Sequence, residues 1–229
     1  MTYWRLRVLQ SAGFATLNEG RKQDRHWVER ENGDYLVPYI LPGNPDTWEI
    51  HISCDDSVVR IFNRKAYPIR RSRGYAPDKL IVDWQFDRHL LACGPEQKNT
   101  FALAKNNAVY LSHHIGDMEN IEVLNSLIDG VSHFRKIFDI QPKVVAYDLH
   151  PDYLSTKYAH EYSQEKGIKG IGIQHHHAHA VSCMVDNKIN KPVLSVILDG
   201  TGFGSDETIW GGELLLTEYH QYKLSLIHI

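Results

Sequence analysis

The chain has 229 residues, of which 42% are hydrophobic and 23% charged, a composition typical of a globular protein with one or two domains. Its formal net charge of -3 at pH 7 argues against a nucleic-acid footprint spread over the whole surface, although a local basic patch is compatible with it. No apolar run approaches the roughly 18 residues of a membrane-spanning helix, and the three scattered cysteines without a CxxC pair indicate reduced thiols and a cytoplasmic protein.

The first half of the chain gives few clear elements. Residues 1–50 mix charged clusters with prolines and glycines, and predict no regular structure. From Ser57 the β-branched stretch SVVRIF predicts a strand. The arginine-rich stretch that follows, Arg64–Pro77, contains Gly74 and Pro77, which favour a loop.

The pattern then becomes regular. The apolar runs HLLACG, TFALAK and AVYLSH are separated by turn residues, including Asn106 and Asn107, and predict a three-stranded antiparallel meander. Apolar residues recur at three- and four-residue steps from Ile121 to Phe138, which predicts an amphipathic helix. The predicted elements that follow are a strand at 143–148, a helix at 152–166, a strand at 168–174, a helix at 176–187 and a strand at 193–200. This order predicts an α/β domain with a mixed sheet, as in the actin-like ATPase architecture.

Four of the 14 histidines lie within five residues, in the stretch GIQHHHAHAV. His175 and His179 are four apart, so on a helix their side chains lie on one face and can share a metal ion. Neutral imidazole suits zinc or ferrous iron. His176 and His177 project elsewhere and are available to support the ligands or to contact a substrate. The plainer alternative is a polar helix start, and a metal site needs at least one more ligand from elsewhere.

A second group lies in ILDGTGFGSDETIWGGE, where Asp199 ends a predicted strand and Gly200, Thr201, Gly202 and Gly204 follow. Such glycines let backbone amides turn toward an anion, and we expect Gly202 to need a positive φ. Nucleotides usually bind at the carboxyl ends of strands in open α/β sheets. An ordinary hairpin turn is the alternative, because DG is a common turn signal.

A third group is DLHPDYLST, which follows the predicted strand at 143–148. His150 and Asp152 can face the same cleft and, together with Asp199 of the second group, are the candidate catalytic residues. The alternative for Asp152 is a helix N-cap, with Pro151 marking the loop before it.

The fourth group is the arginine cluster RRSRGYAP. Arg70, Arg71 and Arg73 can hold a phosphate or a carboxylate through bidentate hydrogen bonds. A solvated run of charge is the alternative.

Seven ordered stretches resemble the hydrogenase maturation carbamoyltransferases of the HypF family: DDSVVR, RRSRGYAP, KNTFAL, LSHHIGDMEN, DLHPDYLST, QHHHAH and LDGTGFGSDETIWGGE. The resemblance implies that residues 54–80 are the C-terminal part of a YrdC-like α/β domain. Residues 88–219 would be the first half of a TsaD-like carbamoyltransferase domain, the first lobe of an actin-like ATPase. Residues 1–53 do not follow the family pattern, and residues 220–229 are expected to be an atypical, truncated tail.

The resemblance also implies an activity. Enzymes of this family form carbamoyl-adenylate from carbamoyl phosphate and ATP, and transfer the carbamoyl group to the C-terminal cysteine of a HypE-type acceptor protein. It implies that His175 and His179 bind a divalent metal, zinc or iron, with Mg²⁺ as a further option, and that Asp199–Gly204 contributes to the nucleotide site. The family's further metal ligand, a downstream aspartate, is missing, so this piece alone is expected to be inactive.

Two other functions remain open at this stage. A related threonylcarbamoyl transferase acting on tRNA is one, although DGTG and RRSRGYAP are the wrong signatures for it. A nonenzymatic metal-binding or nucleotide-binding module is the other. No membrane partner and no specific nucleic acid are expected, although the YrdC-like part could bind RNA weakly.

Overall fold

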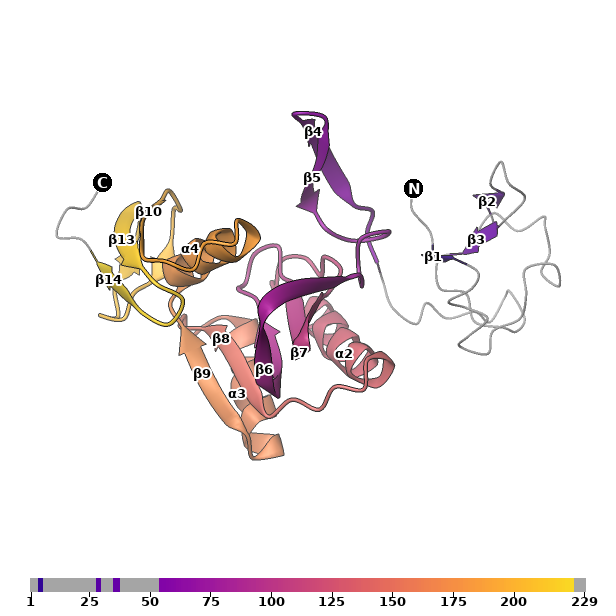
Figure 1. Ribbon diagram of the computed structural model, residues 1–229. Coiled ribbons are helices and arrows are strands. Elements are labelled where there is room, and N and C mark those ends of the chain that lie inside the picture. The colour runs from indigo at the N-terminus through magenta and orange to yellow at the C-terminus, as the bar shows by residue number, and fades with distance from the viewer. Residues whose placement is uncertain (1–3, 6–27, 30–34, 38–53, 225–229) are drawn as a thin grey trace.

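The computed structural model describes residues 4–5, 28–29, 35–37 and 54–224 (Figure 1). The described residues before 54 form the short strands β1 (Trp4–Arg5), β2 (Val28–Glu29) and β3 (Tyr35–Val37), which pair in the order β1-β3-β2. The other residues before 54, for which the sequence predicts no regular structure, lie outside the described part. None of the described helices is both long and apolar enough to cross a membrane.

A β-hairpin opens the continuous part of the structure and projects from the rest of the molecule (Figure 1). Its first strand, β4 (Val58–Phe62), confirms the strand predicted at SVVRIF, and β5 (Lys65–Arg70) pairs with it antiparallel. The prediction of a loop throughout Arg64–Pro77 was therefore wrong for Lys65–Arg70. Pro68 is tolerated there because, in a two-stranded hairpin, one edge of each strand has no partner that needs an N–H.

The central sheet has four strands in the order β7-β6-β8-β9. Their bounds are Lys79–Cys93 for β6, Phe101–Leu111 for β7, Val144–Asp148 for β8 and Lys169–Ile173 for β9. β6, β8 and β9 run parallel, and β7 runs antiparallel to β6. The predicted mixed sheet is confirmed.

The predicted three-stranded meander was wrong, because β7 continues through Asn106 and Asn107, where the sequence pattern predicts a turn. Asn106 has φ 57 and pairs with Phe86 where the β6–β7 register shifts. Asparagine tolerates this left-handed conformation better than most residues, so it makes a β-bulge within one strand instead of a turn between two.

Two helices complete the core of the central sheet. α2 (Ile121–Ile137) begins at Asn120, whose side chain accepts a hydrogen bond from the Val123 N–H, and it confirms the predicted amphipathic helix. α3 (Leu154–Lys166) ends at Gly167, which has φ 60. The buried apolar residues that the two helices share with β6, β7, β8 and the connecting segments are Leu91, Cys93, Phe101, Leu103, Met118, Leu127, Val131, Phe134, Ile140, Val145, Ala159 and Tyr162.

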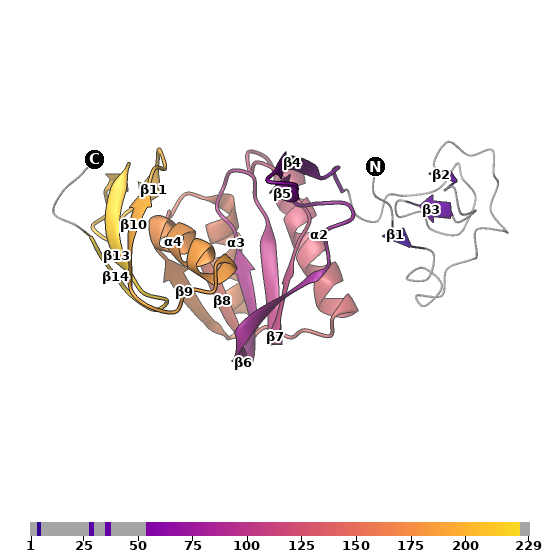
Figure 2. The same cartoon turned by 45° about the horizontal axis from the view of Figure 1, so that its top comes forward.

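A second sheet follows α4 (His175–Asp186). It contains β10 (Val193–Ile197), β13 (Glu213–Thr217) and β14 (Tyr222–Leu224), all antiparallel, in the order β10-β13-β14. β11 (Gly202–Phe203) and β12 (Ile209–Trp210) form a small hairpin between β10 and β13. α4 packs against β10, β11 and β13, between this sheet and the central one (Figure 2). The sequence pattern did not reveal this second sheet. β14 extends it within the segment that was expected to be a tail from residue 220.

Candidate metal and nucleotide site

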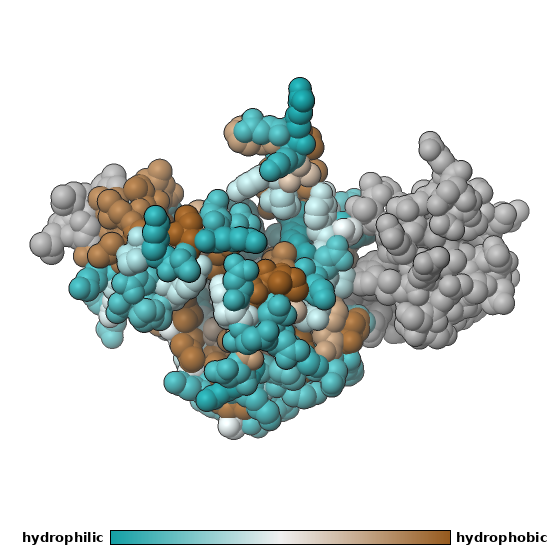
Figure 3. Space-filling model, in the orientation of Figure 1, coloured by the Kyte–Doolittle hydropathy of each residue, from teal (hydrophilic) through white to brown (hydrophobic). Residues whose placement is uncertain are grey.

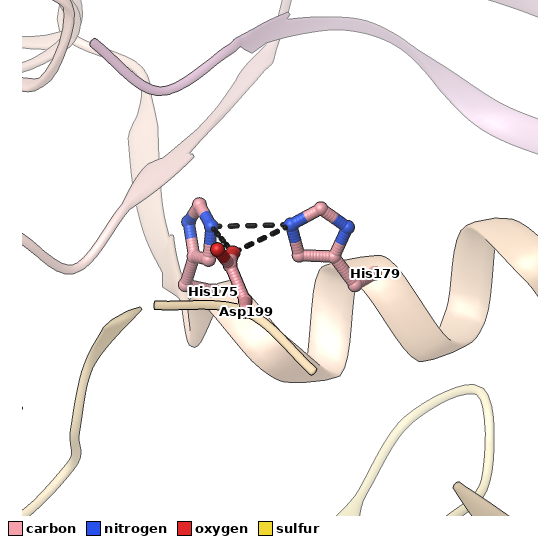
Figure 4. A group of neighbouring side chains, drawn as sticks. All are labelled: His175, His179 and Asp199. Carbon is pink, nitrogen blue, oxygen red and sulfur yellow. Dashed lines mark hydrogen bonds and ion pairs between the residues drawn. The ribbon is translucent and has the colours of Figure 1, made fainter. Parts of the chain in front are cut away.

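Three side chains from α4 and the end of β10 converge beside the first turn of α4 (Figure 4). The Nε2 atom of His175 lies 2.9 Å from the Oδ2 atom of Asp199, and the Nε2 atom of His179 lies 3.1 Å from the same oxygen. The two Nε2 atoms are 3.2 Å apart. The structure therefore brings the predicted histidine pair together with a carboxylate that the sequence analysis had assigned to the nucleotide loop.

Local structure explains why these groups meet. Gln174 is the N-cap of α4 and its side chain accepts a hydrogen bond from the His177 N–H, so the helix begins at His175. His179 is one turn further along the same face. Asp199 follows the carboxyl end of β10, which packs against α4.

The cluster suits a divalent cation. Its three ligand atoms lie within 4.8 Å of one another. Two ligands of one tetrahedral zinc ion, each about 2 Å from it, are about 3.3 Å apart, so these side chains need to shift by only a few tenths of an ångström. Two imidazoles and one carboxylate suit zinc and iron. The resemblance predicts that the third protein ligand is missing from this chain, whereas the structure places the Asp199 carboxylate where a third ligand would lie.

A second carboxylate holds the other side of the His175 ring. The Oδ2 atom of Asp148, at the end of β8, lies 2.7 Å from the His175 Nδ1 atom. This hydrogen bond is the largest cause that raises the pKa of His175 above its ordinary value, and Asp199 adds to it against the opposing effect of burial. Sequence reasoning missed Asp148, although an aspartate at the carboxyl end of a buried strand that adjoins β9 was a usable signal.

Asp199 has hydrogen-bond donors that stabilise its charged form. Burial acts to raise the pKa of this carboxyl group, but the hydrogen bond from the Gly200 N–H and the contact with the His175 ring outweigh it and hold the pKa below its ordinary value. The group therefore remains a carboxylate, as a metal ligand must.

The glycine loop is only in part as predicted. Gly202 and Gly204 are buried, and Gly202 has no positive φ, so that expectation was wrong. A Cβ atom on Gly202 would lie 2.9 Å from the His176 Nε2 atom, and one on Gly204 would collide with Trp210. Packing of the β11–β12 hairpin thus explains both glycines, against α4 for Gly202 and against Trp210 for Gly204. Gly200 and Thr201 are exposed beside Asp199 and remain candidates for contacts with an anion.

His176 and His177 lie inside the protein. The His177 Nε2 atom is 2.8 Å from the Glu218 carbonyl oxygen, which ties α4 to the segment after β13. His176 is fully buried against Trp210 and Gly202, and in the part of the chain that the structure describes neither of its ring nitrogens has a hydrogen-bond partner. Burial lowers the pKa of His176 and keeps the ring neutral.

His150 and Asp152 are placed differently from each other. The His150 ring stacks on Tyr153 at 4.2 Å between centroids and lies 5.3 Å from the Phe203 ring, so it reaches the β11–β12 hairpin. The Asp152 side chain is exposed, and only its backbone N–H contacts His150, at Nδ1. Asp152 is not the N-cap of α3 either, because that position belongs to Tyr153.

Arg70, Arg71 and Arg73 each contact acceptors within the protein. Arg71 donates hydrogen bonds to the carbonyl oxygens of Leu111 and Asp78. Arg73 donates to the Cys54 carbonyl oxygen. Arg70 forms an exposed ion pair with Asp55 at 3.3 Å. Their role in binding a phosphate stays a prediction.

A mixed sheet whose parallel strands lead to a histidine and aspartate cluster, next to a glycine loop, defines a lobe of the actin-like ATPase class with a candidate metal site. Residues 85–186 match the family model described as "HypF Kae1-like domain", and residues 195–228 match "Carbamoyltransferase, Kae1-like Domain, second subdomain". The chain belongs to the HypF family.

Individual relatives agree with this assignment. Carbamoyltransferase HypF2 of Cupriavidus necator is 39% identical over 173 residues, which are 74% of this chain and 21% of the relative. Carbamoyltransferase HypF of Synechocystis sp. is 39% identical over 162 residues, 70% of this chain and 21% of the relative. This chain thus spans about a fifth of the length of these relatives.

Solved structures show the same fold. The crystal structure of full-length HypF in the phosphate- and nucleotide-bound form has a TM-score of 0.71 at 36% identity, over 78% of this chain and 28% of that one. The crystal structure of HypF from T. kodakarensis has a TM-score of 0.64 at 38% identity, over 72% of this chain and 22% of that one.

Proposed function

We propose that this chain supplies the metal-binding lobe of a carbamoyltransferase that acts in the maturation of nickel–iron hydrogenase. The whole enzyme would form carbamoyl-adenylate from carbamoyl phosphate and ATP. It would then transfer the carbamoyl group to the C-terminal cysteine of a HypE-type acceptor protein. In that transfer the acceptor thiolate attacks the carbamoyl carbon, a C–S bond forms, and the C–O bond to the adenylate phosphate breaks to release AMP.

The observation that carries the proposal is the convergence of His175, His179 and Asp199 on one point beside the exposed Gly200 and Thr201. The names of the relatives support carbamoyl transfer, and the nucleotide-bound neighbour supports ATP as the nucleotide. A divalent cation, when bound, supplies Lewis acidity that polarises a carbonyl or a phosphoryl oxygen.

The chain's own residues would bind and orient the substrate. The backbone amides and hydroxyl of Gly200 and Thr201 are available to hold the adenylate phosphate next to Asp199. The Nδ1 atom of His150 accepts a hydrogen bond from the Asp152 N–H, so the neutral ring carries its proton on Nε2 and can donate it to a substrate oxygen. The nucleophile would belong to the acceptor. Within this chain, burial raises the pKa of the Cys93 thiol to about 12 and keeps that thiol protonated.

A chimeric enzyme tests this proposal. Residues of this chain would replace the matching 173-residue segment of Carbamoyltransferase HypF2 from Cupriavidus necator. Carbamoyl transfer to the C-terminal cysteine of the acceptor would be measured by mass spectrometry, with carbamoyl phosphate and ATP supplied. We expect the chimera to be active, and His179→Ala to abolish transfer.

Cys183→Ser is the matched control, because Cys183 lies one turn beyond His179 on the same exposed face of α4. It should leave transfer unchanged. A folded chimera that binds metal but transfers no carbamoyl group would contradict the proposal and favour the nonenzymatic binding module.

A further inference from the structure

One buried carboxylate beside the metal cluster lies on the far side of His175 from the metal position. Asp148 ends β8, and its side chain is only 6% exposed. Its Oδ2 atom lies 2.7 Å from the His175 Nδ1 atom, while Asp199 and His179 face the Nε2 atom of the same ring. The two nitrogens of His175 therefore face different partners.

Asp148 is itself held firmly. Its Oδ1 atom accepts a hydrogen bond from the His150 N–H at 2.9 Å, and its carbonyl oxygen accepts one from the Thr156 hydroxyl at 3.0 Å. The next residue, Leu149, donates its N–H to the Ile173 carbonyl oxygen at the end of β9, just before α4 begins. These contacts fix the carboxylate relative to the helix that carries His175.

We infer that Asp148 is a positioning residue that fixes the ring orientation and the tautomer of His175, so that Nε2 is the free donor atom. A carboxylate has only acceptors, so the neutral ring can give its one proton either to Asp148 at Nδ1 or to Asp199 at Nε2. The contact with Asp148 is shorter, 2.7 Å against 2.9 Å, and Asp148 is 6% exposed against 35% for Asp199, so Asp148 holds the proton. The lone pair is then on Nε2, where the three ligand atoms converge. A buried carboxylate behind a metal-binding histidine commonly has this effect. The inference rests on the proposed metal site.

The geometry predicts that Asp148→Asn weakens metal binding more than Asp148→Ala does. In Asp148→Asn, the His150 N–H still requires an acceptor, so the amide oxygen must take the Oδ1 position. The amide NH₂ then faces Nδ1 of His175 and drives the proton to Nε2, which blocks the metal. Asp148→Ala only removes the hydrogen-bond partner of Nδ1, so the His175 ring can still take the tautomer that binds metal. A simple packing role predicts the opposite order, because asparagine is nearly isosteric with aspartate and alanine leaves a cavity.

Two measurements on the full 229-residue chain test the inference. Co²⁺ affinity, followed through the visible absorption of the bound ion, should fall about 10–100-fold in Asp148→Asn and less in Asp148→Ala. Asp186→Asn, an exposed carboxylate at the end of α4, is the control and should bind as the unchanged chain does. An Asp148→Asn variant that binds Co²⁺ as tightly as the unchanged chain would overturn the inference.

The second measurement needs no metal. Nitrogen chemical shifts of the His175 ring, taken by NMR at alkaline pH where the imidazole is neutral, report which nitrogen carries the proton. We expect Nδ1–H in the unchanged chain and Nε2–H in Asp148→Asn. An Nε2–H ring in the unchanged chain would overturn the inference, whether or not the chain binds Co²⁺. An Nδ1–H ring in a chain that binds no Co²⁺ would instead leave the tautomer assignment standing and contradict the proposed metal site.

Discussion

Gly202 illustrates how one residue type can serve a purpose other than the one its motif suggests. The DGTG stretch favours close approach of backbone to a phosphate, but the structure places Gly202 against the buried ring of His176. Gly200, two residues earlier, has no atom within 4 Å of the position where its Cβ would be. The two glycines of the same motif therefore differ in what a side chain would meet.

Replacing these glycines one at a time distinguishes the closely packed position from the open one. Gly202→Ala should lower the free energy of unfolding by about 1–3 kcal/mol, because the added methyl group overpacks the His176 contact. Gly200→Ala should change it little, since the position is open. Chemical denaturation of the two variants measures the difference. Equal stabilities would mean that Gly202 is not closely packed.

The cysteines give a second prediction at this scale, on pH dependence. Burial raises the pKa of Cys93 to about 12, and Cys183 is exposed. At mildly alkaline pH iodoacetamide should label Cys183 quickly and leave Cys93 unmodified until the chain unfolds, which peptide mass mapping can follow. Because the folded pKa is raised, the stabilising effect is complete below the unfolded value of about 8.5 and is lost as pH rises towards 12.

The loss of stability that comes from Cys93 at alkaline pH has an upper limit that can be measured. The free energy of unfolding should decline by up to ~1.4 kcal/mol per pH unit over that window from this thiol alone. Cys93→Ala should have a shallower decline, measured from its denaturation midpoints across the window. Rapid labelling of Cys93 in the folded chain would contradict the burial on which both expectations rest.

Among the elements, β7 shows where local sequence signals mislead. Asn106 and Asn107 have the composition of a turn, yet Phe101–Leu111 is one strand with a bulge at Asn106. The bulge lets the long strand stay paired with β6 on both sides of the register shift. The local sequence could not show this, because it depends on the pairing partner.

The bulge predicts unequal effects of valine at adjacent positions. Asn106→Val should lower the free energy of unfolding by roughly 1–2 kcal/mol, since a β-branched residue resists φ near +57°. Asn107→Val, which has no positive φ, is the matched control and should be tolerated within the strand. Asn106→Gly should also be tolerated. Chemical denaturation measures all three, and equal losses for both valines would contradict the bulge.

Periodicity was sufficient for most of the other elements. α2 has an apolar face with clear helical spacing, and the buried β8 is a continuous apolar run, so both were predictable. β5 was missed because Pro68 and the arginines are untypical of a strand, and among the described strands β5 pairs with β4 alone. The histidine pair followed from spacing along one helix. Asp148 and the position of Asp199 depend on contacts between elements, so local patterns did not place them.

At the scale of the whole molecule, the described residues leave apolar surface open beside the site. Leu194 and Val196 of β10 and Leu198 just after it alternate in sequence and are 68%, 56% and 81% exposed. Figure 3 shows a hydrophobic area over β10 and β13. A cavity of about 630 Å³ lies between α4 and β10 and reaches His179 and Asp199. This chain spans about a fifth of the length of these curated relatives.

The metal content of the purified 229-residue chain tests the central claim most directly. After incubation with Zn²⁺ and removal of free ion, the unchanged chain should retain about one equivalent, while His179→Ala and Asp199→Asn should each lose it. His179 is 54% exposed, so its truncation should not disturb the core. His220→Ala, also an exposed histidine, should retain the ion. Equal zinc content in all four proteins, or none in the unchanged chain, would contradict the assignment of these side chains as a metal site.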